Sequence, residues 1–231
     1  MRTFLIAIAV LPVAVSPAAA ATRNFGITGF EKIRVEGPFK VVVTTGVAPF
    51  ARAIGSPDAI DRVAIESRGD TLVVHSSLSS WGGYPGRDKG PVEISVGTHD
   101  LRSAWVSGSG SLAIDRAKGL TFDLSVQGSA AGAIKQVDVD QLNVAIVGTG
   151  SGTLAGRAAR MTAVVRGIAS LNAANLAIKD ATIGAEGTST VAASVSDSAA
   201  VDGSGAITIQ LTGSPACTLR VSGSASVSGC R

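Results

Sequence analysis

Glycines recur at an almost constant interval through the C-terminal part of this 231-residue chain. Seven of them, called the marker glycines below, are separated by 20, 20, 19, 20, 16 and 20 residues: Gly108, Gly128, Gly148, Gly167, Gly187, Gly203 and Gly223. A fixed period of this length is typical of repeat proteins, in which each unit contacts only its neighbours. The chain is therefore expected to stack similar units along one axis.

Apolar and polar residues alternate on the approach to each marker glycine. The residues two and four positions before the glycine are apolar in all seven units, as Ile146 and Val144 are before Gly148. This period of two is that of a half-buried strand. It predicts that the marker glycine also faces inward.

Each unit is expected to form two strands that bend at the marker glycine, where a Cβ would collide with the neighbouring unit. Twenty residues at about 3.3 Å each trace a closed path of roughly 66 Å, which suits one coil of a β-solenoid. The sequence therefore predicts an all-β fold, with a right-handed β-helix-like solenoid over residues 101–231. A sandwich of stacked antiparallel hairpins is the competing architecture, and the even period disfavours it.

Residues 22–100 differ from the repeats, because they show short alternating strands between turn signals. Gly37-Pro38 and Arg68-Gly69-Asp70 are two of these signals, and a strand does not tolerate them in its interior. No segment after the N-terminal 21 residues has the period of a helix. We expect a β region that packs onto the solenoid.

The N-terminus has the features of a secretory signal peptide over residues 1–21. Arg2 is followed by an apolar run over residues 4–15 and then by a string of alanines. A membrane-spanning helix needs about 20 apolar residues, so cleavage is favoured over a membrane anchor. The mature protein is expected to start at Ala21 or Thr22, in the periplasm or outside the cell, without an integral membrane segment.

The two cysteines, Cys217 and Cys230, lie close together near the C-terminus. An even pair in an exported chain is most simply a disulfide. Here it would clamp the last coil, on which no further coil stacks. A zinc site is the weaker alternative, because two thiolates are half of its ligands and His75 and His99 are far away in sequence. No metal or other cofactor is expected.

A column of hydroxyl groups follows the marker glycines. Six of the seven residues directly after them carry a hydroxyl, namely Ser109, Ser129, Thr149, Thr188, Ser204 and Ser224, and the exception is Ile168. These residues point outward in the predicted alternation. We expect a ladder in which small hydroxyls bond to each other and to the backbone. The alternative is a flat polar face that binds a glycan or a protein partner.

No constellation of residues in the sequence points to catalysis. The best candidate for a catalytic acidic pair is Asp138 and Asp140. We expect both to lie on a solvated strand edge, because another unit has Lys118 and Leu120 at these positions. The histidines have no serine in a strand-to-helix turn to accompany them. The glycine-rich stretches lack the aspartates of calcium-binding repeats and the lysine of a phosphate loop. The formal net charge of +3 is too small to indicate a nucleic-acid partner.

The loop over residues 76–91, rich in Ser, Gly and Pro, contains the candidate binding residues of the sequence. Trp81, Tyr84 and Arg87 lie there, and loops often carry function. Aromatic side chains of this kind stack on sugars. In the alternative interpretation, Trp81 folds back to cover an open edge of the sheet.

Several motifs resemble those of the head GIN domain of autotransporter adhesins. They are Phe30-Glu31-Lys32-Ile33-Arg34-Val35-Glu36-Gly37-Pro38-Phe39, Leu101-Arg102, and Ser107-Gly108-Ser109-Gly110-Ser111-Leu112 with similar sequences in later units. The resemblance covers essentially the whole mature chain. It implies an exported bacterial protein of β-helical build, and the family offers no catalytic residues to carry over.

The expected function is that of a structural or adhesion module of the bacterial envelope. Its partner would be an envelope component, a glycan or a protein. A β-helical carbohydrate-active enzyme is the alternative, and it would require three or more carboxylates and a base to converge in one groove.

Overall fold

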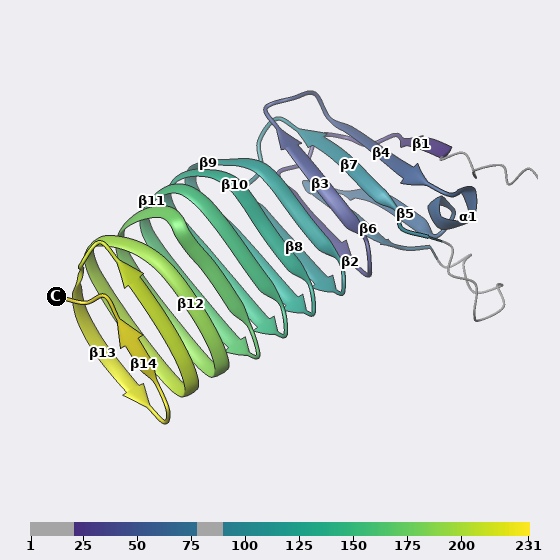
Figure 1. The fold of residues 1–231 in the computed structure, drawn as a ribbon. Coiled ribbons are helices and arrows are strands. Elements are labelled where there is room, and N and C mark those ends of the chain that lie inside the picture. The colour runs from purple at the N-terminus through teal and green to yellow at the C-terminus, as the bar shows by residue number, and fades with distance from the viewer. Residues whose placement is uncertain (1–20, 78–89) are drawn as a thin grey trace, which may run out of the picture.

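A computed structural model describes residues 21–77 and 90–231 of the chain (Figure 1). The strands are β1 (Ala21–Phe25), β2 (Lys32–Glu36), β3 (Lys40–Thr45), β4 (Phe50–Gly55), β5 (Val63–Arg68), β6 (Thr71–Ser76), β7 (Glu93–Thr98), β8 (Ser103–Gly108), β9 (Ser111–Gly128), β10 (Ala131–Gly148), β11 (Ser151–Gly167), β12 (Ser170–Thr212), β13 (Ala216–Ser222) and β14 (Ser226–Ser228). One short helix, α1 (Pro57–Ile60), follows β4. Residues 1–20, which hold most of the predicted signal peptide, lie outside the described residues.

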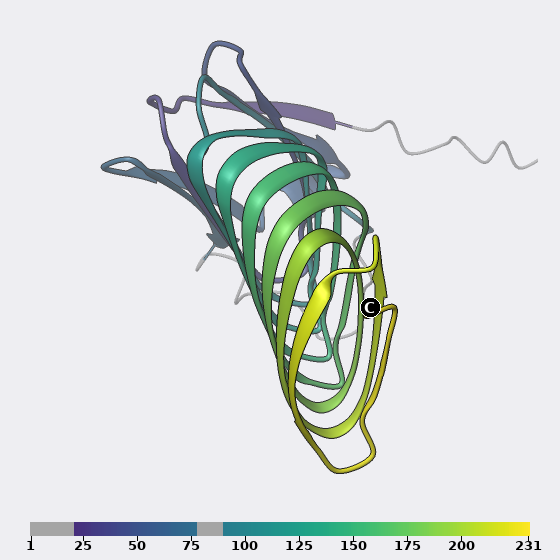
Figure 2. The same ribbon diagram turned by 90° about the vertical axis from the view of Figure 1, so that its left-hand side faces the viewer.

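The repeats form a solenoid whose coils are joined by parallel strand pairing. β9 pairs with β10, β10 with β11, β11 with β12, and β12 with β13, all in parallel. The solenoid has about six turns of about 20 residues each, and Figure 2 looks along its stack of coils. The prediction of a β-solenoid is confirmed. The competing sandwich is excluded, because its hairpins would pair antiparallel.

The apolar residues that the sequence alternation predicts to face inward are buried in the structure. Along β10, Leu142, Val144 and Ile146 are buried, and the residues opposite them in β9 and β11 are buried too. Each coil thus adds one layer of apolar side chains to a continuous column. Burial of one such side chain stabilises the fold by about 1.5–3 kcal/mol, so the stacked layers hold the coils together.

Six of the seven marker glycines do not face inward, and for these the prediction is wrong. Gly108, Gly128, Gly148, Gly167 and Gly187 lie outside the core, with positive φ angles between 77° and 115°. A Cβ built on Gly148 would lie 2.6 Å from the carbonyl oxygen of Gly128 in the coil before it. The alternation stops here because the backbone turns a corner, so a side chain would point along the solenoid axis into the neighbouring coil.

The sixth marker glycine is Gly205 and not Gly203. Gly205 has φ +106°, and a Cβ on it would meet the carbonyl oxygen of Gly187 at 2.4 Å. Gly203 is opposite Val221 in the parallel register and is buried. The last two intervals between corners are therefore shorter than the others. The corresponding residue of the hydroxyl column is Ala206, so the column has two exceptions.

The N-terminal strands continue the solenoid beyond the predicted repeats. β2 pairs in parallel with β8, and β3 pairs in parallel with β9. Between β2 and β3 lies Gly37, with φ +115°, directly against Gly108 in the column of corner glycines. β6 and β7 add a further parallel layer on β2 and β3.

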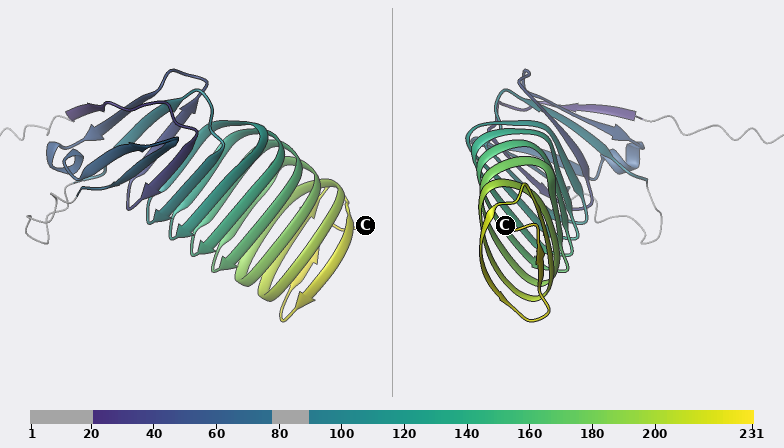
Figure 3. Two further views of the ribbon diagram at one scale, coloured as in Figure 1. Left: turned by 180° about the vertical axis from the view of Figure 1, so that it is seen from behind. Right: turned by 60° about the vertical axis from the view of Figure 1, so that its left-hand side comes forward.

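Antiparallel strands end the stack on the N-terminal side (Figure 3). β5 pairs with β6, β4 with β7, and β1 with β4, all antiparallel. A change of strand direction interrupts the coil pattern, so another coil cannot stack on this end in the same way. Within residues 21–77 and 90–231, no helix is long and apolar enough to span a membrane.

The opposite end of the solenoid is open. Leu219 and Val221 of β13 are 45% and 41% exposed, although their counterparts in the earlier coils are buried. Cys217 and Cys230 stand in the geometry of a disulfide across this end, with sulfurs 2.03 Å apart. The cross-link would tie β13 to the residues that follow β14.

Candidate functional site

The binding residues predicted from the sequence cannot be placed. Trp81, Tyr84 and Arg87 fall within residues 78–89, which lie outside the described part of the chain. Their role in binding stays a prediction. The site described below was not predicted from the sequence.

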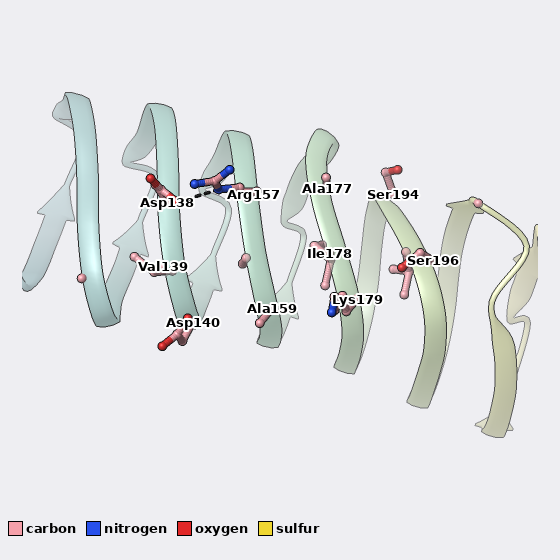
Figure 4. A pocket seen from close by; sticks show the side chains of 14 residues that line it. Asp138, Val139, Asp140, Arg157, Ala159, Ala177, Ile178, Lys179, Ser194 and Ser196 are labelled. Carbon is pink, nitrogen blue, oxygen red and sulfur yellow. Dashed lines mark hydrogen bonds and ion pairs between the residues drawn. The ribbon is translucent and has the colours of Figure 1, made fainter.

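A groove of about 470 Å³ runs across the coils on one side of the solenoid (Figure 4). It begins at Gly119, crosses β10 and β11, and ends in β12 and at Gly213. The residues that line it are Gly119, Asp138, Val139, Asp140, Arg157, Ala158, Ala159, Ala177, Ile178, Lys179, Ser194, Val195, Ser196 and Gly213. Nearly every coil of the solenoid therefore contributes to one continuous surface.

The groove lies where the alternation of each coil is interrupted. In β10, consecutive non-buried residues occur at 135–136 and again at 140–141, and the pairing of β10 with β11 shifts register at the first of these places. Inward-facing residues thus come in three groups per coil, and not in the two expected from a single bend at glycine. The short segment at 137–139 and its counterparts in other coils carry the groove.

Parallel register arranges the groove residues in rows along the solenoid axis. Asp138 is opposite Arg157, and Arg157 is opposite Ala177. Figure 4 shows a second row with Asp140, Ala159 and Lys179. Ala159 leaves space between the charged Asp140 and Lys179, and Ala177 leaves space beside Arg157.

The floor of the groove is apolar and rigid. Val139, Ala158, Ile178 and Val195 lie beneath it, each at most 6% exposed. All four belong to the stacked core, where parallel pairing fixes the backbone on both sides. A bound partner would therefore meet a surface already in its final shape, which reduces the entropy cost of binding.

Arg157 and Asp138 form an ion pair in the wall of the groove, with 2.7 Å between Nε and Oδ1. The hydrogen bond from Arg157 lowers the pKa of Asp138 below its ordinary value. Desolvation opposes this shift, and the charges of Arg157 and Lys118 add to it. The same hydrogen bond raises the pKa of Arg157. Asp138 is therefore a carboxylate at neutral pH and has no proton to donate.

Asp140 and Lys179 keep their charges available to a partner. Neither side chain has an ion pair or side-chain hydrogen bond among residues 21–77 and 90–231. Both are exposed, and they lie in the same row of the groove. Ser194 and Ser196 add hydroxyls in the next coil.

The ion pair restricts the chemistry that Asp138 can perform. Glycoside hydrolysis by two carboxylates uses one protonated general acid and one ionised base or nucleophile, and the lowered pKa of Asp138 fits only the second of these roles. The groove lining includes two carboxylates and no histidine. Across the described residues, no group of three or more His, Cys, Asp or Glu side chains could hold a metal ion.

The hydroxyl column lies at the glycine corner and not in the groove. Ser129 Oγ and Thr149 Oγ1 are 2.8 Å apart and share a hydrogen bond between successive coils, as expected for a ladder. Ile168 interrupts the column with a side chain that is 68% exposed. The column is therefore not a uniform polar face.

Comparison with known proteins assigns the chain to a family. The family model described as putative auto-transporter adhesin, head GIN domain, matches residues 29–215, which is most of the chain. The chain belongs to this family. The match includes the entire groove, whereas β13, β14 and both cysteines follow the matched segment. No curated protein matches the chain.

Solved structures share the GIN-domain fold at low sequence identity. A putative adhesin from Bacteroides fragilis is 19% identical, with a TM-score of 0.75, over 90% of this chain and 96% of that one. A putative lipid-binding protein from Parabacteroides distasonis is 18% identical, with a TM-score of 0.72, over 90% and 95%. A putative adhesin from the same species is 18% identical, with a TM-score of 0.70, over 91% and 96%. At these identities the likeness concerns the fold alone.

Proposed function

We propose that the protein is a non-catalytic, adhesion-type binding module of the bacterial envelope, and that its groove binds a linear glycan. The observation that carries the proposal is the combination of free charges of opposite sign, hydroxyls and small accessible alanines along one rigid groove. Membership of an adhesin family supports a binding role. The predicted signal peptide supports export, and a disulfide near the C-terminus suits an oxidising compartment.

The shape of the groove favours an extended partner. Neighbouring coils are about 4.8 Å apart, so the six coils between Gly119 and Gly213 span roughly 24 Å. A groove of this length accommodates a short oligosaccharide better than a single sugar. Its polar rows would meet hydroxyl and charged groups of the glycan, while the accessible methyl groups of Ala159 and Ala177 would lie against the carbon-bound hydrogens of the rings.

A charge reversal in the groove tests this proposal. Lys179→Glu is expected to weaken binding at least tenfold on an array of neutral and charged oligosaccharides, because a hydrogen bond to a charged group contributes about 1.5–3 kcal/mol. Calorimetry with the best-bound oligosaccharide would supply the affinities. Lys135→Glu is the matched control, since Lys135 is exposed on β10 but does not line the groove. It should bind within about twofold of the unsubstituted protein, because its charge lies outside the contact surface.

Two results would contradict the proposed function. If the unsubstituted protein binds no oligosaccharide, the ligand class is wrong. If Lys179→Glu and Lys135→Glu bind equally well, a glycan is bound but not in the groove.

A further inference from the structure

We infer that the shallow trough beside Trp105 is a second ligand site, where an uncharged sugar ring stacks on the indole. The trough has a volume of about 360 Å³ and lies on the outer face of the strands that precede the glycine corner. Its residues are Ser103, Trp105, Asp123, Leu124, Ser125, Asn143, Val144, Ala145, Thr162 and Val164. The inference rests on the proposed function for its ligand class and concerns different residues.

The trough exists because one large side chain is followed by small ones. Trp105 is opposite Ser125 in the parallel register, Ser125 is opposite Ala145, and Ala145 is opposite Val164. All four side chains belong to the same outward row. The indole therefore stands at one end of a shallow floor, and the residues that follow it in the row, Ser125 and Ala145, are too small to cover it.

Arg34 contacts one face of the indole, and the half-buried Trp105 side chain also lines the trough. The guanidinium of Arg34, from β2, lies over the ring at 4.2 Å from its centroid. β2 and β9 lie on opposite sides of β8, so the other ring face points toward Ser125. Arg34 is held in turn by Glu36, with 2.5 Å between Nε and Oε1. The contact with Arg34 fixes the ring in a position that presents a flat aromatic surface to the trough.

A fixed chain of planar polar groups lines the trough beside this surface. Asn143 Nδ2 donates to Asp123 Oδ1 at 2.8 Å, and Gln141 Nε2 donates to Asn143 Oδ1 at 3.2 Å. Asp123 keeps a second carboxylate oxygen, and Ser103 and Thr162 add hydroxyls. Planar acceptors and donors next to an aromatic ring match a sugar, which has a face of C–H groups and a rim of hydroxyls.

The charges favour an uncharged ligand over an anion. Asp123 is the one charged residue that lines the trough, and its carboxylate repels phosphate, sulfate and uronate groups. The nearby cation, Arg34, is already paired with Glu36. Uncharged sugars are therefore preferred here, whereas the groove offers both signs of charge.

The test compares Trp105→Ala with Trp105→Phe on the same oligosaccharide array, using full-length folded protein. Trp105→Ala is expected to lose at least tenfold in affinity for uncharged oligosaccharides, and Trp105→Phe is expected to keep most of the affinity because a smaller aromatic face remains. Val147→Ala is the matched control, since Val147 is 44% exposed on β10 and does not line the trough. Asn143→Ala provides a second test that leaves the indole in place, and it should also weaken binding.

The outcomes separate this inference from the proposed function. If Trp105→Ala and Asn143→Ala both bind uncharged oligosaccharides as the unsubstituted protein does, while Lys179→Glu binds less, the trough is not a site and the groove proposal stands. If the trough variants lose binding and Lys179→Glu does not, the trough is the binding site and the groove proposal fails. Stronger binding of sulfated oligosaccharides at the trough would overturn the assignment of an uncharged ligand.

Discussion

Replacing Gly148 with valine is expected to destabilise the protein by about 3 kcal/mol or more. The φ of Gly148 is +115°, a conformation that costs a branched residue about 1–3 kcal/mol. The new Cβ would also lie 2.6 Å from the Gly128 oxygen and 3.1 Å from its Cα, and backbone of a paired coil cannot move away cheaply. Thermal unfolding should therefore occur about 6–12 °C lower than in the unsubstituted protein.

Thr149→Val is the matched control at the neighbouring position. Thr149 is exposed, and its hydroxyl shares one hydrogen bond with Ser129. Loss of that bond should cost about 0.5–1.5 kcal/mol at most. If Gly148→Val unfolds at the same temperature as the unsubstituted protein while Thr149→Val is severely destabilised, the account of the glycine corner is wrong.

Removal of both cysteines is expected to destabilise the C-terminal coil by about 3 kcal/mol. Cys217 and Cys230 are 13 residues apart, and a cross-link that closes a loop of this size lowers the entropy of the unfolded chain by about that amount. The effect should be local, because Leu219 and Val221 have no coil on their outer side and this end separates most easily. Hydrogen exchange of β13 in the Cys217→Ser, Cys230→Ser double variant would measure it.

Reduction provides an independent version of the same experiment. The unsubstituted protein with its cysteines reduced should show the same faster exchange in β13 as the double serine variant. Mass spectrometry after alkylation without reductant should find neither Cys217 nor Cys230 alkylated, because both sulfurs are in the disulfide. Two freely alkylated thiols in the native protein would contradict the disulfide and its role as a clamp.

The repeat architecture could be predicted because two periods in the sequence agree. The interval of about 20 residues gives the coil, and the period of two gives the buried rows, such as Val144 and Ile146. Alternation alone does not tell where the backbone leaves the strand conformation. For this reason the pattern predicts the glycines inside the core and Gly203 as a corner glycine, whereas the corner lies at Gly205.

The first coil has the same short pattern of apolar residues before a glycine, but the interval of about 20 residues does not reveal it. Ile33 and Val35 precede Gly37 by four and two residues, as Val144 and Ile146 precede Gly148. Gly37 is 71 residues before Gly108, and the inserted strands β4 to β7 hide the period. A search for the short pattern without a fixed interval would have found this coil.

The groove could not be predicted, because it depends on how corresponding residues of different coils align. Asp138 has Arg157 opposite it although their separation is 19 residues, and the coils differ in length at this corner. Without the register, Asp138 and Asp140 look like an isolated acidic pair on a strand edge. The sequence does not indicate a site at Trp105 for a similar reason, since its partner Arg34 comes from the first coil.

The most direct test of the account is to measure binding and turnover on the same oligosaccharide. The purified protein would be incubated overnight with the oligosaccharide that it binds best, and the chain length and reducing ends would be followed by mass spectrometry. We predict a bound ligand that is recovered unchanged, with binding lost in Lys179→Glu. Shortened chains or new reducing ends that disappear in Asp140→Asn would show that the groove is the active site of an enzyme and would contradict the account.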